Sequence, residues 1–75
     1  MTRLGSYAGS EVVRAFQRAG WTISRQRGSH VILVKAGLEA TLSAPVHKGK
    51  TVKRGTFNDL IKDAGLTSEE FVALV

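Results

Sequence analysis

The apolar run Val31-Ile32-Leu33-Val34 is the feature that most constrains how this chain folds. Side chains alternate between the two faces of a β-strand, so a strand over this run is apolar on both faces. The chain has only 75 residues and no cysteine. A chain of that length buries about 60% of the surface that its unfolded form exposes. We therefore expect one domain over residues 1–75, with a thin core that no disulfide supports.

The residues before this run predict a helix and a strand. Apolar residues recur at helical spacing over about Ser10 to Ala19, and Gly20 follows as a stop signal. Apolar and polar residues then alternate over Trp21 to Ser24, which predicts a short strand. The segment Gln26 to Ser29 supplies a turn into a second strand over His30 to Lys35, so the two strands form a hairpin.

The residues after the run predict the rest of a three-stranded sheet. Ala36-Gly37 can make the next turn, and Glu39 to Ser43 is the third strand. This strand ends before Pro45, which would be poorly placed inside a central strand. The stretch Ala44 to Arg54 is a basic loop. Three strands in meander order place the second strand in the middle of the sheet.

Two helices complete the predicted order. Apolar residues at i, i+3, i+4 and i+7 predict a helix with Thr56 as its N-cap, Asp59 in its first turn and Gly65 at its end. The sequence from Thr67 to Glu70 has the pattern of a capping box and opens a final short helix. The predicted fold class is therefore α+β, in the order α-β-β-β-α plus a terminal turn of helix. A three-stranded antiparallel sheet packs against the helices.

One face of the predicted central strand has no assigned cover. His30, Ile32 and Val34 share one face, while Val31 and Leu33 share the other. Two or three helices can leave one of these faces partly open. A partner protein or self-association of the chain would bury it, and the terminal helix or the N-terminal tail would cover it equally well.

The charge of the chain favours a polyanionic partner. Eleven Lys and Arg residues against six Asp and Glu give a net charge of +5, and residues 1–54 carry ten of the basic residues but only two acidic ones. Nucleic acid or an acidic protein should therefore face the first two thirds of the chain. The lack of cysteine excludes a thiolate metal site. No apolar stretch approaches the roughly 20 residues of a membrane span, so we expect a soluble, cytoplasmic protein.

Three short sequence patterns suggest other kinds of site, and physical arguments disfavour each of them. Ala44 to Thr51 matches a loosened phosphate-binding loop, but a glycine four residues later interrupts the long helix that such a loop needs. Ser29 and His30 are adjacent, so their side chains point to opposite faces and cannot share a proton as a hydrolytic pair. Asp59 and Asp63 lack a third nearby carboxylate, which favours a solvated helix face over a metal site.

His30 is the first candidate for a catalytic residue. Its imidazole can accept and return protons near neutral pH without special tuning. RNA carries its own nucleophile, because a base that removes the 2′-OH proton lets that oxygen attack the adjacent phosphorus. This reaction needs neither metal nor cofactor, and general-base help accelerates it roughly 10²–10⁴-fold. On composition alone, however, a lone histidine is more often structural than catalytic.

Basic residues near His30 are candidates for phosphate contacts. Cations spaced along a loop can follow a phosphate backbone, which gives affinity without reading sequence. A merely solubilising surface is the competing interpretation. For Trp21, core packing is favoured over stacking on a base. The candidate RNA-binding residues are Arg25, Arg27, Ser29, His47, Lys48, Lys50, Lys53 and Arg54.

A series of short motifs resembles one known family, the HicA toxins of toxin–antitoxin pairs, also described as YcfA-like. The motifs run from about Ser10 to Phe71 in the family's order and at its spacing. The chain has a longer N-terminal lead, Met1 to Gly9, than the family pattern implies, and its purpose is open. The matching segments are Ala19-Gly20-Trp21, Arg25 to His30, Pro45 to Lys50, and Lys53 to Thr56 leading into Leu60 to Thr67.

The resemblance implies a fold, an activity and a partner. The fold would be that of a double-stranded-RNA-binding domain, and the activity that of a metal-independent mRNA interferase that inhibits translation and growth. The family's catalytic histidine falls on His30, and a HicB antitoxin would bind and cover it. Two other hypotheses stay open: a non-catalytic RNA-binding module of the same fold, and a protein-interaction subunit whose basic face meets an acidic partner.

Overall fold

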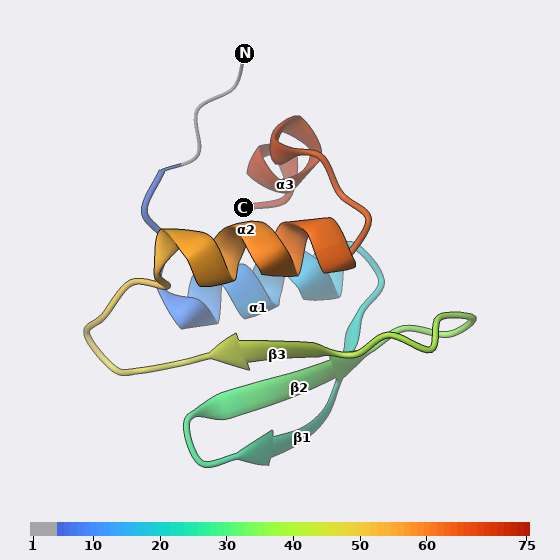
Figure 1. Ribbon diagram of the computed structural model, residues 1–75, viewed down its shortest axis with the longest axis horizontal. Helices are drawn as coiled ribbons and strands as arrows, with labels where there is room; N and C mark the ends of the chain where they lie inside the picture. The colour runs from blue at the N-terminus through green and yellow to red at the C-terminus, as the bar shows by residue number, and fades with distance from the viewer. Residues whose placement is uncertain (1–4) are drawn as a thin grey trace.

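The computed structural model describes residues 5–75 and has the predicted α+β fold (Figure 1). Its antiparallel sheet has the order β1-β2-β3, so the second strand is central as predicted. The helices lie together on one side of this sheet, which gives the arrangement of a double-stranded-RNA-binding domain with one added helix. The elements are α1 (Gly9–Arg18), β1 (Thr22–Arg27), β2 (His30–Val34), β3 (Leu42–Pro45), α2 (Arg54–Asp63) and α3 (Ser68–Leu74).

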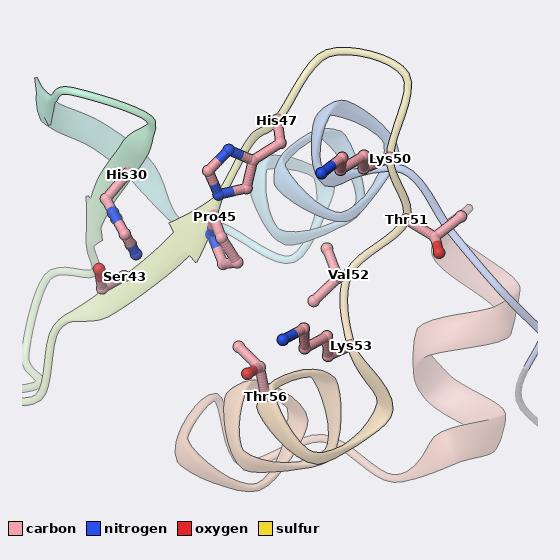
Figure 2. A pocket seen from close by; sticks show the side chains of 9 residues that line it. All are labelled: His30, Ser43, Pro45, His47, Lys50, Thr51, Val52, Lys53 and Thr56. Carbon is pink, nitrogen blue, oxygen red and sulfur yellow. The ribbon is translucent and has the colours of Figure 1, made fainter.

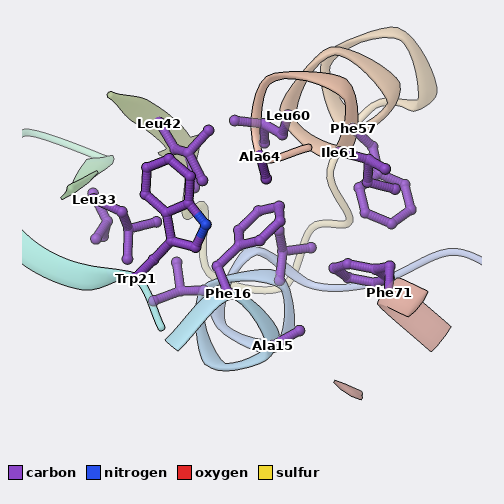
Figure 3. Packing of buried hydrophobic residues seen from close by; sticks show 14 residues of the cluster. Ala15, Phe16, Trp21, Leu33, Leu42, Phe57, Leu60, Ile61, Ala64 and Phe71 are labelled. Atoms are coloured by element: carbon purple, nitrogen blue, oxygen red, sulfur yellow. The ribbon is translucent and has the colours of Figure 1, made fainter. Parts of the chain in front are cut away.

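The core lies between the helices and one face of the sheet (Figure 3). Val31 and Leu33 of β2 and Leu42 and Ala44 of β3 are buried on that face. Trp21 is 1% exposed, which confirms the core packing predicted for it and leaves no ring surface for a base. The other buried side chains are Val12, Val13, Ala15, Phe16, Phe57, Leu60, Ile61, Ala64 and Phe71.

An aromatic cluster joins the N-terminal lead to the helices. The ring of Phe71 in α3 makes edge contacts with Tyr7, Phe16 and Phe57, at centroid distances of 5.4, 5.7 and 4.8 Å. Edge contacts of this kind add to the free energy of burial. The lead is thus packed against the helical side of the fold from Tyr7 onward, while residues 1–4 lie outside the described part of the chain.

The first strand is longer than predicted. Arg25 to Arg27 belong to β1, and the turn consists of Gly28 and Ser29 alone, with Arg27 paired to His30. Gly28 has φ +59°, a conformation that glycine adopts without a Cβ clash, so two residues suffice for the turn. Ile23 pairs with Leu33 and therefore projects from the helical face of the sheet. Ile23 is 49% exposed, because the edge strand β1 lies beyond the cover of the helices.

The third strand lies further along the chain than predicted. It covers Leu42–Pro45 instead of Glu39 to Ser43, and Pro45 pairs with His30. Because β3 is an edge strand, the missing N–H of Pro45 costs the sheet no interior hydrogen bond. The shift in strand position moves Ser43 and Pro45 onto the same face as His30.

The helix ends confirm one predicted cap and correct another. In α3, Thr67 Oγ1 accepts from the Glu70 N–H at 3.1 Å and Glu70 Oε1 accepts from the Thr67 N–H at 2.9 Å, which confirms the capping box. Helix α2 begins earlier than predicted, at Arg54, because the Phe57 N–H already donates to the Lys53 carbonyl at 2.8 Å. Thr56 is therefore not the N-cap, and Asp59 lies beyond the first turn.

Within residues 5–75, no helix has the length and apolar character required to cross a membrane.

Candidate active site

The face of the sheet opposite the helices is open in the described part of the chain. His30 is exposed there, and Ile32 and Val34 on the same face are only partly buried. Helix α3 and the described part of the lead pack on the helical side and do not cover this face. Of the alternatives that the sequence left open, the described residues 5–75 support an uncovered face and not cover by the terminal helix. The exposed face combines a titratable imidazole with an apolar floor.

A β-bulge in β1 brings two arginines to this face. The pairing shifts between Ile23 and Arg25, so Ser24 is an extra residue in the ladder. Simple alternation would put Arg25 on the same face as Ile23. After the bulge, Arg25 pairs with Ile32 and Arg27 pairs with His30. Paired residues of antiparallel strands project to the same face, so both guanidinium-bearing side chains start from the open face.

A pocket of about 430 Å³ lies beside His30, at the edge of β3 (Figure 2). We call it the His30 pocket. One wall is formed by the ends of β2 and β3, and the others by the loop 46–53 and the first turn of α2. Its lining residues are His30, Ser43, Pro45, His47, Lys50, Thr51, Val52, Lys53 and Thr56. A second depression continues from His30 across the sheet face, and it is lined by Arg27, His30, Ile32 and Ser43.

The His30 pocket gathers four of the nine site residues predicted from the sequence. Of these, His30 comes from β2, whereas His47, Lys50 and Lys53 come from the loop 46–53. Arg27 meets His30 in the second depression. Among the described residues no carboxylate lines either cavity, and the basic side chains give the region a positive charge that favours an anion.

The other predicted residues lie outside the two cavities. Arg25 points to the open face by its register but lines neither cavity. Ser29 is in the turn, where its carbonyl accepts from the Val46 N–H at 2.6 Å. Lys48 is exposed in the turn of the loop. Arg54 lines a separate small pocket near Gly5.

Three hydroxyl residues of the His30 pocket were missed from the sequence. Thr56 was assigned to a helix cap, and Thr51 was passed over in the basic loop. Ser43 is a neighbour of His30 because β3 pairs it with Ile32. A correct strand boundary would have found Ser43 by alternation, whereas Thr51 and Thr56 reach the pocket only through the tertiary fold.

The loop that carries His47 and Lys50 is held from behind by the N-terminal lead. Ala8 forms an isolated antiparallel β-bridge with Thr51, and the Val52 N–H donates to the Tyr7 carbonyl at 2.9 Å. Gly9 lies so close to the loop that a Cβ at this position would be 2.8 Å from the Val46 Cα atom and would overlap the Pro45 carbonyl. The lead therefore positions one wall of the His30 pocket.

Comparison with known families identifies the chain. The family model described as HicA toxin of bacterial toxin–antitoxin systems matches residues 9–66 of the 75. The chain belongs to the HicA toxin family. This confirms the resemblance seen in the motifs and supports a role as a toxin. The match covers both cavities and ends before α3.

No curated protein is similar enough to the chain to count as a match. In the described residues 5–75, no three His, Asp or Glu side chains gather closely enough to hold a metal ion.

Proposed function

We propose that this HicA family toxin is an endoribonuclease that cleaves mRNA without a metal ion, and that His30 moves a proton in the reaction. The observation that carries the proposal is the convergence at His30. An exposed imidazole stands where the His30 pocket and the sheet-face depression meet, with Arg27 on one side and Lys50 and Lys53 on the other. No carboxylate in the described cavities opposes the phosphate groups of RNA.

The chemistry follows from the substrate. The 2′-OH of RNA loses its proton, the 2′-oxygen bonds to the adjacent phosphorus, and the bond from phosphorus to the 5′-oxygen breaks. The products are a 2′,3′-cyclic phosphate and a 5′-OH. Imidazole transfers protons well near neutral pH. Positive side chains beside the phosphate stabilise the negative charge that builds on its oxygens.

The form of the site favours single-stranded RNA. The exposed sheet face has arginines on one side and lysines on the other, and these side chains can contact successive phosphates of an RNA strand. Such contacts position the strand on the protein without reading its bases. Trp21 is buried and unavailable for stacking. Recognition through phosphates and the 2′-OH fits a toxin that cleaves mRNA in the cytoplasm and so inhibits translation and growth.

A HicB-like antitoxin is the expected protein partner. Ile32 and Val34 give the open face apolar area beside His30, and burial of such a patch stabilises a complex. A partner seated on this face would cover the catalytic imidazole and exclude RNA. Self-association through the same face would also cover His30. Measuring the molecular mass of the purified toxin in solution, without antitoxin, shows whether the toxin self-associates.

The test uses the purified toxin, free of antitoxin, with mixed-sequence single-stranded RNA in excess EDTA. The wild type and the control Lys62→Ala, which removes an exposed cation that does not line the pocket, should produce RNA with 2′,3′-cyclic phosphate ends. His30→Ala should bind RNA but leave it intact. RNA left whole by the folded wild type would favour a non-catalytic RNA-binding module. Unchanged cleavage by His30→Ala would refute the role of His30.

A further inference from the structure

The second histidine of the chain lines the same pocket as the first. Figure 2 shows the rings of His30 and His47 facing one hollow, with Pro45 between them. Pro45 pairs with His30, and the hydrogen bond from the Val46 N–H to the Ser29 carbonyl continues this pairing one residue past β3. His47 follows two residues after Pro45, just beyond the end of β3, and lines the His30 pocket together with His30.

This placement suits a reaction that needs two proton carriers. In an in-line displacement the attacking 2′-oxygen and the leaving 5′-oxygen lie on opposite sides of the phosphorus. One imidazole cannot reach both sides at once. The 5′-oxygen leaves as an unstable alkoxide unless a proton reaches it. His30 and His47 are the only histidines of the chain, and imidazole is in general a better proton carrier near neutral pH than an ammonium group.

We infer that His47 is the general acid of the cleavage, acting opposite His30 as the general base. This inference rests on the proposed ribonuclease function. His30 takes the proton of the 2′-OH, the 2′-oxygen bonds to phosphorus, and the bond to the 5′-oxygen breaks as His47 passes its proton to that oxygen. Lys50 and Lys53, on the pocket wall shared with His47, hold the non-bridging phosphate oxygens.

The fold fixes the loop that His47 belongs to. The Lys50 N–H donates to the His47 carbonyl at 3.0 Å, which closes a turn at the tip of the loop. Tyr7 and Ala8 hold the end of the loop at Thr51 and Val52. Gly9 packs closely against the start of the loop, at Pro45 and Val46. An exposed histidine on an unsupported loop would have no defined direction, whereas this one faces a defined cavity.

The test compares two RNA oligonucleotides that differ in one atom. One has the natural 5′-oxygen at the cleaved bond, and the other has sulfur there. A thiol has a pKa near 8.5, so the sulfur leaves as a thiolate without receiving a proton. His47→Ala should cleave the oxygen substrate about 10²–10⁴-fold more slowly than wild type, and the sulfur substrate at nearly the wild-type rate. His30→Ala should be slow on both, and Lys62→Ala normal on both.

Each other outcome contradicts a defined part of the inference. An equal loss by His47→Ala on both substrates, with the variant folded by circular dichroism, would mean that His47 binds or positions RNA and transfers no proton. Full activity of His47→Ala on the oxygen substrate would mean that His47 has no role in the cleavage. A folded wild type that cleaves neither substrate would overturn the proposed ribonuclease function itself, and this inference with it.

Discussion

The two faces of the sheet come from the same strands but have opposite characters. On the helical face, Leu33 and Leu42 are 0% and 1% exposed. His30 of β2 and Ser43 of β3 project to the other face and are exposed there. Alternation lets one strand stabilise the fold with every second residue and present reactive groups with the residues between. Stability and activity should therefore be separable by substitution at adjacent positions.

The largest effect on stability is expected at the helical face. Leu33→Ala removes a fully buried side chain and leaves a cavity, which should lower the free energy of unfolding by about 2–5 kcal/mol. Ile32→Ala, at the next residue but on the half-covered open face, should cost clearly less. Urea denaturation of both variants makes the comparison. Equal losses would mean that the open face is buried in solution, as in a dimer.

A substitution in the N-terminal lead should affect both fold and site. The Cβ of Gly9→Ala meets backbone at Pro45 and Val46, so the loop must move and the free energy of unfolding should fall by about 1–3 kcal/mol. RNA cleavage should fall as well, because the His30 pocket loses its wall. Gly55→Ala is the matched control. It has open space around the new Cβ within α2 and should be neutral or slightly stabilising. Wild-type cleavage by Gly9→Ala would show that the lead does not position the loop.

Two neighbours in β1 test the effect of the bulge. Arg27 lies on the open face opposite His30, and Gln26 projects to the other face opposite Val31. Arg27→Ala should weaken binding to single-stranded RNA about 10-fold. This is the effect expected from the loss of one charge-assisted hydrogen bond to a phosphate. Gln26→Ala should bind normally. Fluorescence anisotropy with a labelled oligonucleotide measures both, and equal losses would contradict the register that the bulge imposes.

The smallest effect concerns salt. A single lysine in the His30 pocket should contribute one phosphate contact, so Lys53→Ala should reduce the slope of log K against log salt by about 0.7 for single-stranded RNA. Lys62→Ala removes the same charge from the far end of α2 and should leave the slope unchanged. Identical slopes for the two variants would mean that the net charge of the chain, and not the pocket, attracts RNA.

The helices, the core and the strand order were predictable because they depend on local periodicity. Burial of Trp21 and the capping box of Thr67 and Glu70 follow directly from spacing, as does the shared face of Val31 and Leu33. Which face of β2 is buried did not follow from spacing. The extent of β1 was not predictable, because a bulge at Ser24 breaks the alternation that the prediction used. The position of β3 was predicted wrongly because proline is excluded from central strands but not from edge strands, and β3 is an edge strand that ends at Pro45.

The candidate site was predictable in part of its residues but not in its shape. His30, His47, Lys50 and Lys53 stood out by chemical type, and the fold brings them to one pocket. The wall behind His47 depends on the close approach of Gly9 to Val46, residues 37 positions apart. No local pattern signals such a tertiary contact. The role of the lead therefore became clear only from the folded chain.

The most direct test of the central claim measures cleavage rate and stability together for His30→Ala. The account predicts single-turnover cleavage of single-stranded RNA in EDTA that is at least about 100-fold slower than wild type, with a free energy of unfolding within about 0.5 kcal/mol of it. Such a result would assign catalysis to the open face and stability to the helical face. Cleavage that survives in the folded variant, or that falls only as far as the folded fraction falls, would contradict the account.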